Sequence, residues 1–361
     1  MLPSHGANPH KLFQQLGIPQ PEHMIDLSEN VNVAGIPQSI RNSWTEYVQV
    51  IEKYPDPQGE PFLSAIANKH HISKECVLVG NGAAELFTFL AMFLAKQRVI
   101  LVHPTFSEYE ATLSVHEAQL IHVEVENVCT WSLPMEQIQQ EMKQAKAIYL
   151  CTPNNPTGVL PPQEQLQTIM EWGEQFNCYV ILDEAFMDWL EPEPTMIPCS
   201  EQFLHTIIVR SMTKMYGLAG IRLGYLIAQP QLIQKLASYA AHWHVNSLAA
   251  TIGTQCLQEE EYRKQTIDTT IEQRENWRQY LRNQGCVVAN SQTNYLCFQL
   301  PNPQHTKQFY RYFLEKGIVF RHTENYRVLQ GEWLRMGLKT AEEMKIVEQE
   351  MTWWFQQTAI L

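Results

Sequence analysis

The sequence has little charge for its length and no basic cluster. Charged residues make up 18% of the 361 residues, and 38 acids outnumber 26 lysines and arginines, which gives a formal net charge of −12. A nucleic-acid partner is therefore excluded as a first hypothesis, because phosphates require a positive face. An anionic small molecule would instead have to meet a few placed arginines or lysines.

Long apolar runs and paired cysteines are also missing. The longest apolar run, 86–95, is interrupted by Thr88 and is shorter than the roughly 18 residues that a membrane span requires. The first residues show no basic-then-apolar signal pattern. Eight scattered cysteines form no C-x-x-C pair, which argues against a zinc site or a disulfide framework. We expect a cytoplasmic globular protein without a metal and without a membrane partner.

Short apolar runs alternate with helical stretches between about residues 76 and 228. Near-continuous runs of β-branched residues are typical of parallel strands that are buried on both faces. These runs are 77–79, 99–102, 147–150, 179–182 and 207–209. We therefore predict an α/β fold with an N-terminal arm (1–40), a large domain (41–270) and a smaller α+β domain (271–361).

Lys214 lies just after the last of these runs, where ligands bind in open α/β sheets. It follows the hydroxyls of Ser211 and Thr213 and precedes Arg222. This arrangement suits a Schiff base between the amine and a phosphorylated aldehyde, with Thr213 and Arg222 on the phosphate. A solvated surface lysine before a glycine-rich loop is the alternative interpretation.

Polar or small residues follow three other runs. Asp183 ends the run 179–182, where a carboxylate suits a protonated pyridine nitrogen or, alternatively, a helix N-cap. Asn155 lies between two prolines and suits donation to a phenolic oxygen, although an ordinary turn also explains it. Ala83 and Ala84 open a helix whose free N–H groups can bind a phosphate.

Together these residues resemble the class I and II aminotransferase superfamily of fold type I over essentially the whole chain. Asn155, Asp183, Lys214 and Arg222 occur in the order and at the spacing of that family. The resemblance implies a homodimer that binds pyridoxal 5′-phosphate (PLP) on Lys214, with Asp183 at the ring nitrogen. It also implies a large domain in which a mostly parallel seven-stranded sheet lies between helices.

The resemblance implies roles for three further residues. Phe106 matches the aromatic residue that stacks on the pyridine ring, although a core phenylalanine is an equally simple interpretation. Tyr54 matches a tyrosine that reaches across the dimer interface to the phosphate of the neighbouring subunit's cofactor. Arg335 matches the arginine that holds the anionic end of the substrate bidentately.

Within the superfamily the chain resembles the L-threonine-O-3-phosphate decarboxylases of cobalamin biosynthesis and, next, the histidinol-phosphate aminotransferases. Segments 4–8 and 28–32 are similar to His-Gly-Gly-Asn and Ser-x-Asn-x-Asn segments of the decarboxylases, although Ala7 replaces a glycine. Phe186 stands where the aminotransferases usually have tyrosine. Arg321 matches an arginine near the decarboxylase substrate.

The decarboxylase resemblance implies a phosphorylated amino acid as substrate. Arg335 would hold its α-carboxylate and Arg321 and His5 its phosphate, with Asn32 also at the substrate, while CO2 leaves to give (R)-1-amino-2-propanol O-2-phosphate. The alternatives are a disordered terminus for His5 and a solvated strand position for Arg321. A histidinol-phosphate aminotransferase would instead break the Cα–H bond and use Arg335 for phosphate. A PLP-binding transcription regulator fits poorly, because the chain is acidic and has no room for a DNA-binding domain before Leu12.

Overall fold

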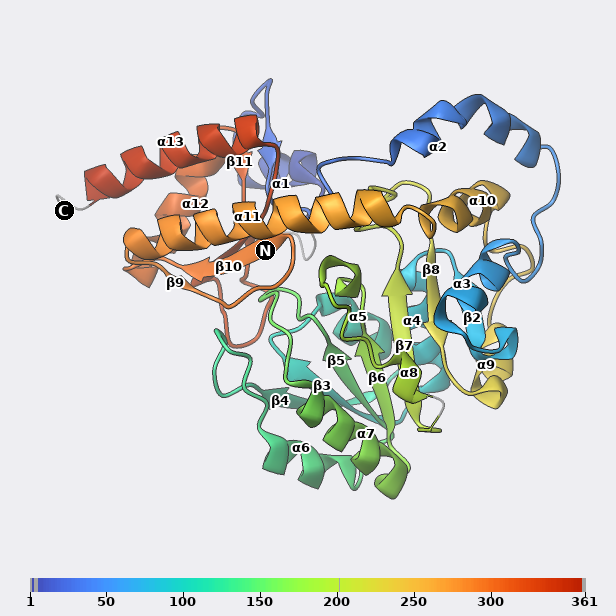
Figure 1. Cartoon of the computed structure of the whole chain (residues 1–361). Coiled ribbons are helices and arrows are strands. Elements are labelled where there is room, and N and C mark those ends of the chain that lie inside the picture. Colours follow the sequence, from blue (N-terminus) through green and yellow to red (C-terminus); the bar gives the residue numbers. More distant parts are fainter. Residues whose placement is uncertain (1, 3–5, 201, 359–361) are drawn as a thin grey trace.

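A seven-stranded sheet forms the centre of the molecule (Figure 1). The computed structural model describes Leu2, residues 6–200 and residues 202–358. The sheet order is β2-β8-β7-β6-β5-β3-β4. Its strands are Val77–Gly80 (β2), Arg98–His103 (β3), Gln119–Glu124 (β4), Ala147–Cys151 (β5), Tyr179–Asp183 (β6), Thr206–Ser211 (β7) and Gly224–Ile227 (β8). Only β8 runs against its neighbours, so the expected α/β fold with a mostly parallel seven-stranded sheet is confirmed.

Helices bury both faces of this sheet. Successive side chains of a strand point to opposite faces, so Val99 and Leu101 of β3 join one core cluster and Ile100 and Val102 join another. The first cluster contains residues of α4 (Ala83–Phe93), α5 (Ser107–Val115) and α9 (Pro230–Ala237). The second contains residues of α3 (Phe62–His70), α6 (Met135–Met142), α7 (Gln163–Phe176) and α10 (Ser247–Cys256). Burial on both faces explains why the strands are apolar at successive positions.

A smaller unit lies beside the carboxyl ends of the parallel strands (Figure 1). Its four-stranded antiparallel sheet has the order β12-β13-β10-β9. These strands are Arg321–His322 (β12), Trp333–Gly337 (β13), Tyr295–Gln299 (β10) and Val287–Val288 (β9). Two helices pack on the sheet, α12 (Thr306–Glu315) and α13 (Ala341–Thr358).

The N-terminal segment packs mainly on the smaller unit. Leu12 and Phe13 of α1 (Pro9–Leu16) are buried in its core, and β1 (Ile25–Asp26) pairs in parallel with β11 (Ile318–Val319). The chain then crosses to the large unit, where α2 (Gln38–Asn42) and the 3-10 helix η1 (Trp44–Val50) lie.

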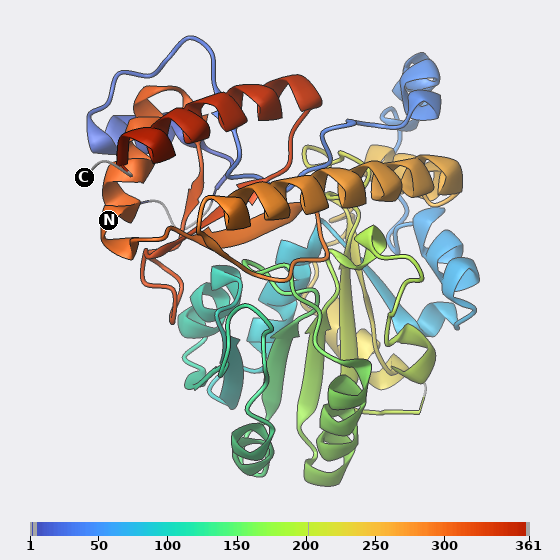
Figure 2. The ribbon, with the colours of Figure 1, turned by 60° about the vertical axis from the view of Figure 1, so that its left-hand side comes forward.

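One long helix, α11 (Glu260–Asn283), runs along both units (Figures 1 and 2). Ile267 belongs to the core of the large unit, whereas Trp277 and Leu281 belong to the core of the small one. The boundary predicted at residue 270 therefore lies inside a helix, at the point where its buried residues change from one core to the other. None of the helices formed by the described residues is long and apolar enough to cross a bilayer.

Candidate active site

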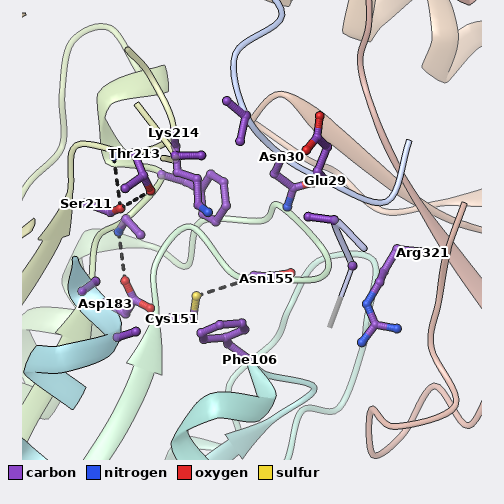
Figure 3. A pocket seen from close by; sticks show the side chains of 18 of the residues that line it. Glu29, Asn30, Phe106, Cys151, Asn155, Asp183, Ser211, Thr213, Lys214 and Arg321 are labelled. Atoms are coloured by element: carbon purple, nitrogen blue, oxygen red, sulfur yellow. Dashed lines mark hydrogen bonds between the residues drawn. The ribbon is translucent and has the colours of Figure 1, made fainter. Parts of the chain in front are cut away.

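A cavity of about 320 Å³ opens where the carboxyl ends of the parallel strands meet the smaller unit. Its size is that of a small-molecule pocket. Its wall comes from the arm, the start of α4, the loops after β3, β5, β6 and β7, and the smaller sheet. Figure 3 shows side chains of the residues that line it. The expected site residues that line it are Ala83, Ala84, Phe106, Asn155, Asp183, Thr213, Lys214, Arg222, Arg321 and Arg335.

Lys214 projects into this cavity from the turn after β7 (Figure 3). Its backbone carbonyl accepts a hydrogen bond from the Asn32 N–H at 3.0 Å, which ties the turn to the arm. Burial, and then the charges of Arg335 and Arg222, lower the pKa of the amine to about 8. A larger fraction of the amine, roughly a tenth at pH 7, is therefore unprotonated than for an ordinary lysine, as a nucleophilic lysine requires.

Asp183 ends β6 in the wall of the cavity and is only 4% exposed. The Tyr109 hydroxyl donates to one carboxylate oxygen, and the Ala185 N–H donates to the other at 3.0 Å. Burial raises the pKa of Asp183 to about 6, although these two donors and Lys214 oppose the rise. A buried carboxylate with an elevated pKa is a suitable partner for a protonated ring nitrogen.

The start of α4 lines one end of the cavity with groups that can bind an anion. Ala83 and Ala84 are the first residues of this helix, where backbone N–H groups lack intrahelical acceptors. The Arg222 guanidinium lies so close that a Cβ on Gly82 would be 2.5 Å from its Nη2 atom. The hydroxyls of Ser211 and Thr213, 2.7 Å apart, complete this end.

Phe106 and Asn155 also line the cavity. Phe106 precedes α5 and lies at the cavity wall, where its ring can cover a planar ligand (Figure 3). The Asn155 N–H donates to the Cys151 sulfur at 3.3 Å, and its side-chain oxygen accepts from Arg335 at 2.6 Å. These two contacts hold Asn155 in the cavity wall, and its expected donation to the cofactor stays a prediction.

Two buried arginines face the cavity from the smaller sheet. Arg321 and Arg335 are register partners on the antiparallel strands β12 and β13, and they are 2% and 5% exposed. Arg335 donates to the Ser28 carbonyl at 2.5 Å, and Arg321 donates to the His322 carbonyl at 2.6 Å. Burial, and less strongly Arg335, lower the pKa of Arg321. Like charges opposite each other destabilise a strand pair, so this arrangement is suited to an anionic ligand.

Two expected site residues, Asn32 and Tyr54, do not line the cavity. Asn32 is buried, and its amide donates to the Met215 carbonyl and the Tyr262 hydroxyl, both at 2.8 Å, which supports the turn after Lys214. Its expected contact with a substrate stays a prediction. Tyr54 is 81% exposed and packs on Trp243, with ring centroids 4.9 Å apart. His5 lies outside the described residues.

The structure adds residues that the sequence analysis did not identify. Tyr109 contacts Asp183, and Cys151 lines the cavity beside Asn155. Glu29 also lines the cavity and forms an ion pair with Lys339 at 2.8 Å. A buried tyrosine and a buried cysteine look like ordinary core residues in a sequence, so no pattern distinguishes them.

A group of metal-ligand type lies outside the cavity lining. His103, Glu110 and His122 bring one ligand-type atom each to within 4.8 Å of one another. The His103 Nε2 and His122 Nδ1 atoms are 2.9 Å apart, and a guanidinium nitrogen of Arg327 lies 3.3 Å from His122 Nε2. A cation beside these imidazoles disfavours a metal ion there, and the expected absence of a metal stays a prediction.

Comparison with known proteins matches this geometry. The sequence model of the family "Aminotransferase class I and II" covers residues 22–349. The threonine-phosphate decarboxylase of Salmonella typhimurium is 30% identical over 342 residues, which cover 94% of this chain and 93% of that protein. The histidinol-phosphate aminotransferase of Methanococcus maripaludis is 25% identical over 343 residues, 94% of this chain and 91% of that protein.

Among solved structures, the histidinol-phosphate aminotransferase of Sinorhizobium meliloti in complex with pyridoxal-5′-phosphate has a TM-score of 0.86. It is 19% identical, and the match covers 97% of this chain and 95% of that one. The described residues fit the same cofactor: a buried amine, a buried carboxylate, and a guanidinium, Arg222, for which Gly82 leaves room beside the start of α4. The chain therefore belongs to the class I and II aminotransferase family and is a PLP-dependent enzyme.

Proposed function

We propose that the chain decarboxylates L-threonine O-3-phosphate to (R)-1-amino-2-propanol O-2-phosphate. The observation that supports this most directly is the pair of buried guanidinium groups, Arg321 and Arg335, opposite each other on β12 and β13. Among the described residues, no carboxylate lies within ion-pair distance of Arg335. A substrate with both a carboxylate and a phosphate supplies one anion for each guanidinium.

PLP, when bound, supplies an electron sink for the electron pair released at the substrate α-carbon. Lys214 would hold the cofactor until the substrate amine takes its place. Its amine, of lowered pKa, would then return a proton to the α-carbon from its protonated form after CO2 has left. Asp183 would keep the ring nitrogen of the bound cofactor protonated. Arg335 holds the α-carboxylate and Arg321 the phosphate, which fixes the orientation of the substrate.

Phe186 supports decarboxylation over transamination. It lines the cavity beside Lys214, whose Nζ atom is 6.0 Å from the ring centroid, and its ring packs on Tyr295 at 5.0 Å. A tyrosine at this position would add a hydroxyl at the cofactor. With Phe186, Asn155 would be the side chain that donates to the phenolic oxygen of the cofactor. We expect the loss of a second donor there to favour decarboxylation over the proton transfers at the α-carbon that transamination requires.

Histidinol-phosphate transamination is the second candidate, and the similarity to aminotransferases of that name over 94% of the chain favours it. In that reaction both arginines would hold a single phosphate, and the rest of the cavity would accept an imidazole.

The two reactions are distinguished by one parallel assay of L-threonine O-3-phosphate and of histidinol phosphate with 2-oxoglutarate. We expect CO2 release from the first and little glutamate from the second. Arg321→Ala and Arg335→Ala should each lower kcat/KM for decarboxylation by at least about tenfold, because a charge-assisted contact contributes roughly 1.5–3 kcal/mol. Arg327→Ala, which removes an exposed arginine from the loop between β12 and β13, is the matched control.

Glutamate formation without CO2 release would contradict the decarboxylase proposal and support the second candidate. Unchanged kcat/KM in both cavity variants would instead contradict the assignment of the two anion contacts. Absorbance of bound PLP should persist in all three variants, since none of them removes Lys214.

A further inference from the structure

We propose that Tyr109 is a positioning residue for the cofactor: its hydroxyl keeps the Asp183 carboxylate ionised and aimed at the ring nitrogen of PLP. The proposal depends on PLP binding in this cavity, which the family establishes, and not on which bond of the substrate is broken. It can therefore fail while the proposed reaction stands, and the reverse also holds.

Packing fixes the Tyr109 ring. Tyr109 lies in the first turn of α5 and is completely buried. Its ring meets Phe87 edge-on at 4.9 Å, Tyr149 at 5.1 Å and Phe106 edge-on at 5.7 Å. Phe106, the residue just before α5, is expected to cover the cofactor ring, so this one segment supplies both an aromatic ring for the cavity wall and a hydroxyl for the carboxylate.

The hydroxyl has one charged partner. It donates to Oδ2 of Asp183, while the Ala185 N–H donates to Oδ1 at 3.0 Å. Each carboxylate oxygen therefore has one protein donor and retains a lone pair for the N–H of a protonated ring. No cationic side chain of the described ranges is within ion-pair distance of Asp183, so these two donors are its direct support.

The chemistry of Tyr109 makes it a permanent donor. Burial, and then the charge of Asp183, raise the pKa of the phenol well above its ordinary value, so the hydroxyl does not ionise. Burial also raises the pKa of the neighbouring Cys151 thiol, with Asp183 acting in the same direction. Neither group brings a second negative charge to the carboxylate.

Without the hydroxyl, the burial that raises the Asp183 pKa is less strongly opposed. A more basic carboxyl takes the shared proton from the ring nitrogen, and the neutral ring both binds less tightly and withdraws electrons less strongly. Tyr109→Phe removes the hydroxyl and leaves the ring, so it isolates this effect from packing.

Tyr149→Phe is the matched control. Tyr149 is a buried tyrosine of the same cluster, in contact with Tyr109, and its hydroxyl has no hydrogen-bond partner among the described residues. Removing that hydroxyl changes the same core by the same atom without touching Asp183.

The first measurement is the dissociation constant for PLP, obtained by titrating the apoprotein with PLP and recording its tryptophan fluorescence. We expect Tyr109→Phe to raise it at least about tenfold, the weight of a hydrogen bond to a charged group, and Tyr149→Phe to leave it unchanged. In an Asp183→Asn background, Tyr109→Phe should change the constant by less than about threefold, because a neutral amide has no charge to stabilise.

The second measurement is the absorbance band of lysine-linked PLP, near about 410–430 nm, recorded against pH. Its apparent pKa should rise in Tyr109→Phe, because a less protonated ring withdraws less electron density from the linkage. If Tyr109→Phe does not fold, 3-fluorotyrosine in place of Tyr109 keeps the ring and strengthens the donor, and it should lower the same pKa. The proposal is overturned if the band does not move, or if Tyr109→Phe weakens PLP binding equally with Asp183 and with Asn at position 183.

Discussion

At the scale of single residues, the cavity holds two groups whose pKa values burial shifts in opposite directions. Burial raises the pKa of Asp183 to about 6 and lowers that of Lys214 to about 8. In the apoprotein, burial thus destabilises the charged form of both side chains. Bound PLP would stabilise the ionised Asp183 by supplying a positive partner. The apoprotein is therefore less stable than a protein with a neutral residue in this place.

This cost predicts a pH-dependent difference between the wild-type and Asp183→Asn apoproteins. The folded-state pKa of about 6 exceeds the ordinary value of 3.8, so the folded state binds more protons between these two pH values. Wild-type stability should therefore rise relative to Asp183→Asn as the pH falls from 8 to 5, by about 1–2 kcal/mol. Urea unfolding of both apoproteins at the two pH values measures it. An equal difference at both would show that Asp183 is already ionised at pH 5.

At the scale of elements, the turn between β2 and α4 depends on one glycine. Gly82 has φ +82°, and an added Cβ would lie 2.5 Å from the Arg222 guanidinium. Gly82→Ala should strain this turn by on the order of 1–3 kcal/mol and displace Arg222 from the start of α4. We expect loss of its contact with the cofactor phosphate to weaken PLP binding at least about tenfold. Equilibrium titration of the apoprotein with PLP measures the effect.

Gly220→Ala is the control for this prediction. Gly220 lies two residues before Arg222, and a Cβ there would meet no atom within 4 Å. Its affinity for PLP should equal that of the wild type. If Gly82→Ala also binds PLP normally, Arg222 and the start of α4 do not bind the cofactor phosphate.

The strands and helices and the residues at their ends could be predicted from the sequence, whereas contacts between distant segments could not. Lys214 and Asp183 were predictable because each follows an apolar run, and parallel strands bring such ends together. The pairing of Arg321 with Arg335 was not predictable, since it depends on the register of two short antiparallel strands. Asn32 was expected at the substrate from the family pattern of its segment, and that pattern does not reveal that its amide donates to Tyr262 on α11.

At the scale of the whole molecule, one exposed segment of the large unit points to a second copy of the chain. This segment carries four exposed large apolar or aromatic residues: Trp44, Val48, Ile51 and Tyr54. Tyr54 packs on Trp243, which is also exposed. Clusters of this kind mark interaction sites. The expected homodimer would cover them and bring Tyr54 to the phosphate of the partner's cofactor.

We therefore expect sedimentation to give a dimer, and Tyr54→Ala to weaken PLP binding by roughly tenfold through loss of one phosphate contact. Trp353→Ala, which removes an exposed aromatic residue from α13 of the small unit, should change neither property. A fully active monomer, or normal PLP affinity in Tyr54→Ala, would remove Tyr54 from the cofactor contacts.

The continuous helix α11 limits how the two units can move. A helix of 24 residues is about 36 Å long, so a tilt of only about 5° displaces one end by about 3 Å relative to the other. Arg263 anchors one end to the Leu190 carbonyl at 2.7 Å, and Arg274 reaches the Thr293 carbonyl near the small sheet at 3.3 Å. The helix thus joins the two cores stiffly. We expect a tilt too small to disturb the packing of the large unit to displace the small unit, which carries Arg335, by the larger distance.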